Sequence, residues 1–470
     1  MLSKVFKAYD VRALYPNPLN ERIAWQIGHA TAEYILGYAT QHGAGTPMAK
    51  HIVVGRDMRK SSPALSTALI DGMRAYGANV IDVGLVDTPF VYFAINHLGT
   101  AGGVQVTASH NPANYNGFKV SKLAAKPVGA DTGLNEIQRL AALVDPDTVA
   151  SKGGTRESRD LWKPYREHLL RFLAPEVVNG GRPMKVVIDA SNGMAGTMVP
   201  KVFQDPSARI SGLSIVPINF DNSTGEFVHE PNPLVESNLA QVRAGVKEHK
   251  ADFGVCFDGD ADRCMVIDER GEPVGCDILL AALVKDALAG MPKGTAVVYD
   301  LRSSRSVAEA IREAGGTPVE SRVGHVFMKA KLAEAKAPIG GELSGHFYFG
   351  DMFGTDSGAR AFVAVLTALS HAKKPLSQLV APFQRYVQSG EINFENADKE
   401  GAIASLKKAY PKAKVTELDG VSLDVGSWWC NVRLSNTEPL LRLNLEAKDK
   451  ATVDKAVADV SAMLGKRVDH

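Results

Sequence analysis

Three stretches of the chain repeat one pattern of apolar and polar positions. Each combines a short β-branched run, an acidic residue and a turn: H-I-V-V-G-R-D (51–57), M-K-V-V-I-D-A-S-N-G (184–193) and G-T-A-V-V-Y-D-L-R (294–302). A helical pattern follows, as in S-P-A-L-S-T-A-L-I-D-G-M-R-A-Y (62–76). Because short strands alternate with helices, the sequence predicts mixed α/β layers in which the strands pair largely in parallel.

The repeats also indicate how the chain divides into domains. They begin roughly 110–130 residues apart, which suits one α/β domain each. After residue 386 the pattern changes to hairpin-like strands with two helices, which is typical of a smaller α+β domain. We therefore expect three similar α/β domains and a C-terminal α+β domain. The expected boundaries are 1–154, 155–272, 273–386 and 387–470.

Composition describes an ordinary soluble globular protein. Of 470 residues, 45% are hydrophobic and 22% charged, and 53 basic residues nearly balance 52 acidic ones, for a net charge of +1. No block of one charge stands out, so a nucleic-acid or membrane-surface role has no electrostatic support. An anion bound by this protein must therefore be held by charges placed locally.

The same features predict a cytoplasmic protein. The first residues lack the apolar run of a signal peptide, and the most apolar helical stretch (278–291) is interrupted by Lys285 and Asp286. The cysteines form no C-x-x-C pair, so we expect reduced thiols in the core. They are Cys256, Cys264, Cys276 and Cys430.

The motif D-G-D-A-D-R (258–263) predicts a metal site. Aspartates at i, i+2 and i+4 of an extended chain point to one side and offer hard oxygen ligands to one divalent cation. An EF-hand calcium loop is the rival, with Glu269 at its twelfth position. That loop needs glycine at position 6, where Arg263 stands, and C-M-V-I-D after it indicates a strand. Magnesium is therefore the favoured ion.

T-A-S-H-N-P (107–112) places Ser109 where a strand should end. No G-x-S-x-G elbow surrounds this serine, and a free hydroxyl is a weak nucleophile. On its own Ser109 is a turn or helix-cap residue more often than a nucleophile. His110 and Lys119 are equally ambiguous alone.

Two further loops suit a phosphorylated sugar. In G-E-L-S-G-H (341–346), a carboxylate and a hydroxyl alternate along an extended loop whose glycines let a ligand approach the backbone. In R-L-S-N-T-E-P (433–439), a guanidinium and several short polar side chains precede a proline, as in a cradle for a phosphate dianion. Each loop could equally be a turn without a ligand.

The order of these four loops, one in each expected domain, resembles the α-D-phosphohexomutase superfamily. Within it the chain is most similar to the bacterial phosphomannomutase/phosphoglucomutase branch, from K-A-Y-D-V-R (7–12) to L-L-R-L-N-L-E-A (440–447). The resemblance implies four domains around a central cleft. It also implies an isomerase that moves a phosphoryl group between O1 and O6 of mannose or glucose.

The resemblance assigns roles to individual residues. It implies a phosphoserine at Ser109 that also ligates Mg²⁺, with a hexose 1,6-bisphosphate as intermediate and activator. The implied metal ligands are Ser109, Asp258, Asp260 and Asp262. The implied catalytic residues are Ser109, His110, Lys119, Arg12, Arg263 and His346, with His346 or Lys119 preferred as general acid and base. The implied substrate contacts are Tyr9, Arg302, His325, Glu342, Leu343, Ser344, Arg433, Ser435, Asn436 and Thr437.

Three residues depart from the pattern of the family. Ala13 and Ala261 stand where many relatives have glycine, and Arg302 stands where some have lysine, which leaves substrate contacts there open. A phosphoglucosamine mutase is the alternative enzyme, although its branch resembles G-E-Q-S-G-H and this chain has Leu343. A catalytically silent phosphosugar-binding protein and a Mg²⁺ phosphatase fit less well. We expect a small phosphosugar as partner, no nucleic acid or membrane, and a monomer or weak homodimer.

Overall fold

The computed structural model describes residues 2–43, 45–148, 152–434 and 440–468. The chain forms two compact units, each assembled from two pieces of sequence. The first unit contains Met1–Val274 and Ser344–Leu379. The second contains Gly275–Leu343 and Val380–His470.

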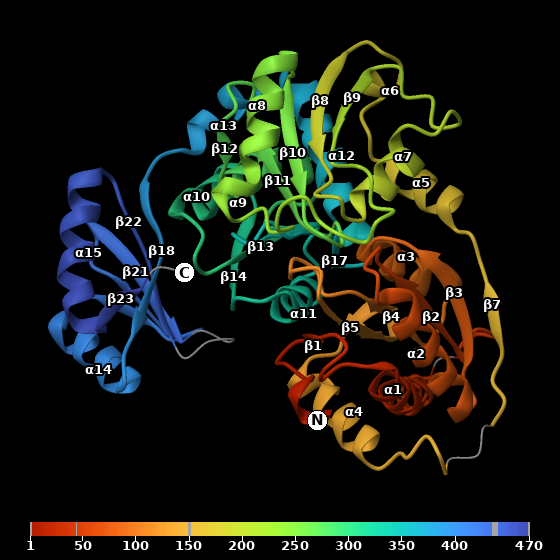
Figure 1. Cartoon of the computed structure of the whole chain (residues 1–470). Helices are drawn as coiled ribbons and strands as arrows, with labels where there is room; N and C mark the ends of the chain where they lie inside the picture. Colours follow the sequence, from red (N-terminus) through yellow and green to blue (C-terminus); the bar gives the residue numbers. More distant parts are fainter. Residues whose placement is uncertain (1, 44, 149–151, 435–439, 469–470) are drawn as a thin grey trace. The chain divides into compact units, whose positions relative to one another are not determined.

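The N-terminal sheet of the first unit has the strand order β1-β5-β4-β2-β3-β7, with β6 paired to β5 (Figure 1). Strands β4, β2, β3 and β7 run parallel, whereas β5 is antiparallel to β1 and β4. The strand predicted from H-I-V-V-G-R is β2, and its parallel pairing is confirmed. The strands are β1 (Val11–Leu14), β2 (His51–Arg56), β3 (Asn79–Leu85), β4 (Gly102–Val106), β5 (Tyr115–Lys122), β6 (Lys126–Pro127) and β7 (Arg156–Ser158).

A second sheet of the first unit has the order β12-β11-β10-β8-β9. Strands β10, β8 and β9 are parallel, and β11 returns antiparallel to β10. D-G-D-A-D-R is the connection between β10 and β11, so the sheet holds both ends of that loop. The strands are β8 (Met184–Asp189), β9 (Leu213–Ile218), β10 (Phe253–Phe257), β11 (Cys264–Ile267) and β12 (Pro273–Val274). The unit also contains the antiparallel pair β16 (Phe347–Phe349) and β17 (Thr355–Asp356).

The second unit contains a parallel group and an antiparallel sheet. Strands β14 (Thr317–Ser321) and β15 (Ile339–Gly341) both pair in parallel with β13 (Ala296–Asp300), the strand predicted from A-V-V-Y-D. The C-terminal sheet has the order β19-β20-β21-β22-β18-β23 and contains the predicted hairpin-like strands. Its strands are β18 (Val387–Glu395), β19 (Lys414–Thr416), β20 (Val421–Asp424), β21 (Trp428–Leu434), β22 (Leu440–Ala447) and β23 (Lys466–Val468).

Helices pack on these sheets as the repeated pattern predicts. In the C-terminal part, the helices α14 and α15 lie together on one face of the sheet (Figure 1). The first unit has α1 (Glu21–Gln41), α2 (Ser62–Tyr76), α3 (Thr88–Leu98), α4 (Leu134–Ala142), α5 (Trp162–Leu170), α6 (Pro175–Val178), α7 (Ala195–Phe203), α8 (Ala240–His249) and α12 (Gly358–Ala372). The second has α9 (Cys276–Ala287), α10 (Arg305–Glu313), α11 (His325–Ala335), α14 (Lys399–Ala409) and α15 (Lys450–Leu464); α13 (Leu376–Val380) precedes β18.

Helices α1 and α2 approach each other through glycines. A methyl group on Gly72 would lie 2.0 Å from the carbonyl oxygen of Trp25, and one on Gly28 would lie 2.1 Å from that of Leu69. Both contacts are with backbone atoms, so a side chain at either position would push the helices apart. This pair covers the N-terminal sheet, whose buried residues include Val54, Val104 and Phe118 among a continuous apolar cluster.

The described residues contain no helix that is both long and apolar enough to cross a membrane. The four cysteines are buried as free thiols, in agreement with the prediction of reduced core residues. Burial raises the pKa of the Cys430 thiol to about 12, so this sulfur stays protonated and unreactive near neutral pH.

Candidate active site

The three aspartates of D-G-D-A-D-R converge at the end of β10. Ligand oxygens of Asp258, Asp260 and Asp262 all lie within 4.8 Å of one another, and the three side chains are buried. The convergence does not come from an extended chain, which is what the spacing predicted. Residues 259–261 form a turn in which Ala261 has a φ of 58°, and the turn brings the carboxylates together.

The triplet fits a divalent cation. Asp260 Oδ1 is buried and has no hydrogen-bond partner among the residues that the structure describes. Burial and the neighbouring carboxylates of Asp262 and Asp260 raise the pKa of Asp258 well above its ordinary value. An unsatisfied buried oxygen and crowded carboxylates both call for positive charge at this point.

Ser109 lies beside the aspartates. Its hydroxyl donates a hydrogen bond to Asp258 Oδ2 over 3.0 Å, and its side chain is buried. The backbone at Ser109 has a φ of 51°, in the left-handed region that a non-glycine residue seldom occupies. A methyl group on Gly259 would lie 2.4 Å from the carbonyl oxygen of Ser109, so glycine at 259 is needed for this approach. The structure therefore joins two loops that are 149 residues apart.

A buried arginine that the sequence analysis did not single out holds the serine loop. Arg59 is fully buried, pairs with Asp57 Oδ2 over 3.0 Å and donates to the carbonyl oxygens of Ser109 and Asn111 over 2.8 and 2.7 Å. It also donates to the carbonyl of Pro112 over 2.5 Å. Because several backbone acceptors share one guanidinium, Arg59 fixes the path of the loop that carries Ser109. Its only signal in the sequence is the R-D-M-R turn after β2.

Cationic side chains surround the triplet. Lys119 Nζ donates to Asp260 Oδ2 and Asp262 Oδ2 over 2.7 and 2.5 Å, and Arg263 Nε lies 3.8 Å from Asp258 Oδ2. Burial lowers the pKa of Lys119, but the two carboxylates outweigh burial and raise the pKa above its ordinary value. Lys119 is therefore a fixed positive charge near neutral pH.

Arg12 contacts the serine loop from the N-terminal segment. Its Nη1 donates to Asn111 Oδ1 over 2.6 Å, and its Nη2 pairs with Asp10 Oδ2 over 2.5 Å. Tyr9, which precedes Asp10 in the chain, is half-buried.

Thr88, at the start of α3, also contacts the triplet and was not predicted from the sequence. Its hydroxyl donates a hydrogen bond to Asp260 Oδ2 over 2.5 Å.

Two histidines lie at this site. His110 Nδ1 is 3.4 Å from Ser109 Oγ. Burial, together with Arg263 and Arg12, lowers the pKa of His110 well below its ordinary value, so this imidazole is neutral near pH 7. His346 Nε2 lies 3.3 Å from Asp262 Oδ1, and its Nδ1 is 2.8 Å from Ser344 Oγ.

The sugar loop is a turn and not the extended segment that was expected. Ser344 and His346 belong to the first unit, whereas Glu342 and Leu343 belong to the second. Glu342 Oε1 accepts a hydrogen bond from the backbone N–H of Gly324 over 2.8 Å, one residue before His325 at the start of α11. The two acceptor groups of the motif therefore have separate partners.

Within the second unit, Asp300 places two of the predicted substrate contacts. Its Oδ2 accepts from the backbone N–H of Leu343 over 2.9 Å and from Arg302 Nη2 over 2.8 Å. Asp300 is buried at the end of β13, where the repeated pattern put an acidic residue. The acid that ends the repeat thus orients Arg302 and the sugar loop together.

Three arginines of the second unit share one carboxylate. Glu391 Oε2 lies 2.8 Å from Arg433 Nη2 and 3.5 Å from Arg302 Nη1, and Glu391 Oε1 lies 3.0 Å from Arg442 Nη1. Burial raises the pKa of Glu391, but the arginines outweigh burial and lower it below its ordinary value. Three guanidinium groups against Glu391 and against Asp300, which also pairs with Arg302, leave a local excess of one positive charge, which suits an anion such as a phosphate. Arg302 and Arg433 were predicted from the sequence, whereas Glu391 and Arg442 were not.

Three predicted phosphate contacts, Ser435, Asn436 and Thr437, lie outside the described residues. Arg433 precedes them on β21 and is buried.

Comparison with family models accounts for most of the chain. Four models of the phosphoglucomutase/phosphomannomutase family match in order: α/β/α domain I at residues 3–145, domain II at 163–271, domain III at 276–386 and the C-terminal domain at 391–463. These matches describe three α/β/α domains followed by a fourth of different type, as the repeated pattern predicted.

Full-length relatives give the same result. A protein of Xanthomonas campestris pv. campestris (strain B100) named "Phosphohexose mutases" is 38% identical over 99% of this chain and 100% of its own length. A phosphomannomutase of Salmonella typhimurium is 37% identical over 94% of both chains. The crystal structure of a phosphoglucomutase/phosphomannomutase family protein from Burkholderia thailandensis superposes with a TM-score of 0.86 at 31% identity, covering 99% of this chain and 97% of that one.

Proposed function

The chain belongs to the phosphoglucomutase/phosphomannomutase family, and from this premise we propose how its residues carry out the reaction. It is a hexose phosphate mutase, an isomerase that acts on a small phosphosugar. Our proposal is that mannose or glucose 1-phosphate and 6-phosphate interconvert through a phosphoserine at Ser109 and a hexose 1,6-bisphosphate. The domains that divide this work are 1–154, 155–272, 273–386 and 387–470.

The observation that carries the proposal is the contact between Ser109 Oγ and Asp258 over 3.0 Å. A phosphoryl group on this oxygen would adjoin a carboxylate triplet, which repels it unless positive charge intervenes. Lys119 and Arg263 supply two positive charges against the three aspartates. A divalent cation would turn the remaining single negative charge into a single positive one.

Asp258, Asp260 and Asp262 are the residues that would hold this cation, which we assign as Mg²⁺. Carboxylate oxygens are the hard ligands that such an ion prefers. When bound, Mg²⁺ would offset charge on the phosphoryl group and on the serine oxygen.

Ser109 both donates and accepts the phosphoryl group. In the first transfer its P–O bond breaks while a bond forms to the free hydroxyl oxygen of the substrate, which gives the bisphosphate. In the second transfer Ser109 Oγ takes the other phosphoryl group and releases the isomerised monophosphate. The groups around Ser109 provide position and charge compensation, which are the main requirements of phosphoryl transfer.

In each transfer the acceptor hydroxyl must also lose a proton and the leaving oxygen must gain one. His110 Nδ1, 3.4 Å from Ser109 Oγ, takes this proton when Ser109 is the acceptor and returns it to the serine oxygen when Ser109 is the leaving group. The negative charge of the phosphoryl groups would raise the lowered pKa of this imidazole toward the range of a general base. Lys119 was a preferred base from the sequence, but its raised pKa suits it to charge compensation instead. His346 serves the substrate hydroxyl, with Ser344 Oγ bonded to its other ring nitrogen.

Substrate recognition completes the proposal. Arg433, with Ser435, Asn436 and Thr437, holds the phosphate that does not react, helped by the excess charge around Glu391. Glu342 and Ser344 bind the 3- and 4-hydroxyls, with Tyr9, Arg12, Arg302, His325 and Leu343 as further contacts. A site that contacts these two hydroxyls does not contact the 2-position, where mannose and glucose differ, so it accepts both sugars.

The test is a Mg²⁺-dependent assay on the 1-phosphates of mannose, glucose and glucosamine, with a trace of bisphosphate activator. We expect conversion of the first two to 6-phosphates by the wild-type chain and its loss in Ser109→Ala. Intact mass before and after phosphatase treatment measures the phosphoserine independently. Conversion by Ser109→Ala at the wild-type rate would contradict the proposed mechanism.

A further inference from the structure

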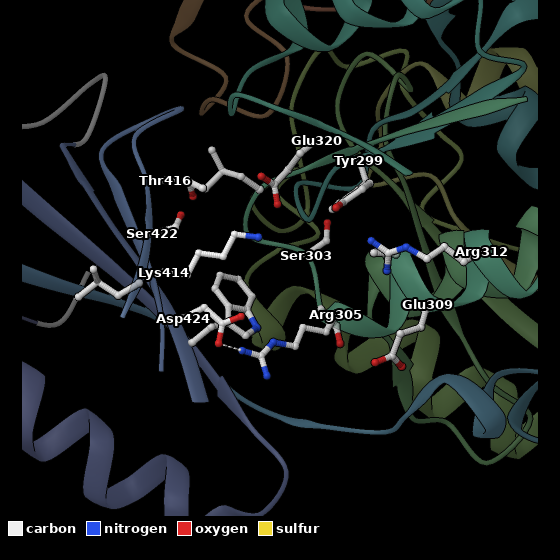
Figure 2. Close-up of a pocket in the computed structure, with 15 residues that line it drawn as sticks. Tyr299, Ser303, Arg305, Glu309, Arg312, Glu320, Lys414, Thr416, Ser422 and Asp424 are labelled. Carbon is white, nitrogen blue, oxygen red and sulfur yellow. Dashed lines mark hydrogen bonds and ion pairs between the residues drawn. The ribbon is translucent and has the colours of Figure 1, made fainter. Parts of the chain in front are cut away.

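A second pocket lies within the second unit, outside the residues assigned to catalysis. It has a volume of about 350 Å³, which is within the range of small-molecule sites. It is lined by β13 and α10 on one side and by β19, β20 and β21 of the C-terminal sheet on the other (Figure 2). No lining residue is among the predicted catalytic, metal or substrate residues.

Two of the acidic groups in the pocket already have cationic partners. Asp424 Oδ1 pairs with Arg305 Nη2 over 2.6 Å, the contact drawn as a dashed line in Figure 2. Glu309 pairs over 2.8 Å with Arg385, which it shares with Glu313, and accepts a hydrogen bond from the hydroxyl of Tyr386 over 2.6 Å. The other charged residues of the lining are Arg312, Lys414 and Glu320.

Two cations in the pocket form no close ion pair with the described residues. Across the described parts of the chain, the side chains of Arg312 and Lys414 have no carboxylate within ion-pair distance and no hydrogen bond. Both point into the pocket, Lys414 from β19 toward Ser303 and Arg312 from α10 on the other side (Figure 2). Glu320 is the one lining carboxylate without an ion pair in that same part of the structure. The lining has as many carboxylates as cations, so an anion would be held by the local placement of Arg312 and Lys414 and not by a net charge of the pocket.

A buried hydroxyl also lacks a partner. The side chain of Ser303 is only 4% exposed, and its Oγ has no hydrogen-bond partner among the described residues, although a buried hydroxyl is normally bonded. Ser303 lines the pocket, so a ligand oxygen there would satisfy it.

The start of α10 does not contribute to the attraction for an anion. The backbone N–H of Ser304 donates to Asp277 Oδ2 over 2.9 Å, and that of Arg305 donates to Glu446 Oε1 over 3.1 Å. The first donors of the helix are therefore occupied by two buried carboxylates. The attraction for an anion rests on the two side-chain cations and the free hydroxyl.

We propose that this pocket binds a phosphate monoester of a hydroxylated ring, at a site separate from the catalytic residues. Arg312 and Lys414 hold the phosphate, and Ser303 Oγ donates to it. Glu320 accepts from ring hydroxyls, and the indole of Trp429, which also lines the pocket, packs against the ring. Because Ser303 follows Arg302, a ligand here adjoins the chain segment that carries a predicted substrate contact.

Binding is measured on the full-length protein by isothermal titration calorimetry with AMP, ribose 5-phosphate and adenosine as probes. We expect saturable binding of at least one ester and none of adenosine. Tighter binding of AMP would identify a nucleotide, and equal or tighter binding of ribose 5-phosphate a sugar phosphate. Trp429 should report the same event by a fluorescence change that Trp429→Phe removes.

The variant that tests the site is Arg312→Gln combined with Lys414→Gln. We expect the affinity for the bound ester to fall by about tenfold or more, since two charged contacts are lost. Lys412→Gln is the matched control, because Lys412 is exposed two residues earlier and does not line the pocket. Arg433→Gln, at the predicted substrate site, should leave this binding unchanged.

The proposal is overturned if neither ester binds at millimolar concentration, if adenosine binds as tightly as AMP, or if the double variant binds like the wild type. Thermal unfolding of the double variant shows whether it is folded; both substituted residues are exposed, so we expect a wild-type melting temperature. The mutase assay is run separately, so a failure of the second site leaves the proposed catalytic function untouched.

Discussion

At the scale of single residues, the loop that carries Ser109 depends on a side chain outside it. The left-handed backbone at Ser109 costs free energy, about 1–2 kcal/mol for a residue with a Cβ atom. The bonds from Arg59 to the carbonyl oxygens of the loop offset this cost. The reactive geometry is therefore imposed by the surroundings of the serine.

Arg59→Lys should separate this positioning role from simple charge. The lysine can keep an ion pair with Asp57, but it cannot reach all the carbonyls that the guanidinium fork bonds. We expect kcat to fall by about 10²-fold from misplacement of Ser109, with a smaller change in KM. Steady-state kinetics of the variant give this split.

Arg56→Lys is the control for that measurement. Arg56 is only half-buried, and among the described residues its side chain makes one long hydrogen bond, of 3.5 Å, to the carbonyl of Asp57. Equal kinetics for Arg59→Lys and the wild type would show that Arg59 does not position the loop.

Asp87 predicts a pH dependence of stability. Burial raises its pKa to about 7, and its Oδ2 accepts a hydrogen bond from the hydroxyl of Tyr165 over 2.9 Å. Between about pH 4 and pH 7 the folded chain keeps a proton that the unfolded chain has released. The free energy of unfolding should therefore fall as pH rises through this window, by up to about 4 kcal/mol, and change no further above it.

Denaturant unfolding of the wild type and Asp87→Asn at pH 5 and pH 8 measures this effect. The amide cannot ionise, so the variant should lose less stability than the wild type over that interval. An identical pH dependence in both proteins would mean that Asp87 ionises in the folded state with an ordinary pKa.

At the scale of elements, the packing of α1 against α2 is set by glycine. Gly72→Ala would place a methyl group 2.0 Å from the carbonyl of Trp25, a backbone atom that cannot move away alone. We expect a loss of about 1–3 kcal/mol in the free energy of unfolding. Chemical denaturation measures the loss.

Gly37→Ala, on the exposed face of α1, has the opposite expectation. Within the described parts of the chain, no atom outside its own helix lies within 4 Å of the added methyl group. Alanine favours the helix by about 1 kcal/mol, so this variant should be more stable than the wild type. A loss of similar size in both variants would contradict the packing argument.

Much of the element structure could be predicted from the sequence, because it follows from local patterns. Strands β2, β8 and β13 and the D-G-D-A-D-R loop each depend on a few adjacent residues. Glu391 and Arg59 could not be found in this way, since each acts on partners far along the chain. The turn at Ala261 was also missed, because spacing alone does not distinguish an extended loop from a bent one.

At the scale of the whole molecule, the two compact units divide the predicted functional groups. The aspartate triplet and Ser109 belong to the first unit, and the arginines around Glu391 belong to the second. A ligand that binds only the folded state stabilises the part that holds its site.

Mg²⁺ should therefore shift one part of the unfolding profile. With saturating Mg²⁺ at about 100 times its Kd, the first unit should gain about 2.7 kcal/mol, and the second should gain nothing. Differential scanning calorimetry with and without Mg²⁺ measures both parts. Asp260→Asn should abolish the shift, and a shift that survives in this variant would place the ion elsewhere.

Residues 344–379 join the first unit although the second unit's residues 275–343 precede them in the chain. Their helix α12 packs against α5, α6 and β11, so the first unit needs this late segment to cover its own core. During synthesis, residues 1–274 emerge from the ribosome long before helix α12 does. Apolar surface in the N-terminal part of the enzyme therefore stays exposed until the chain has been synthesised past residue 379.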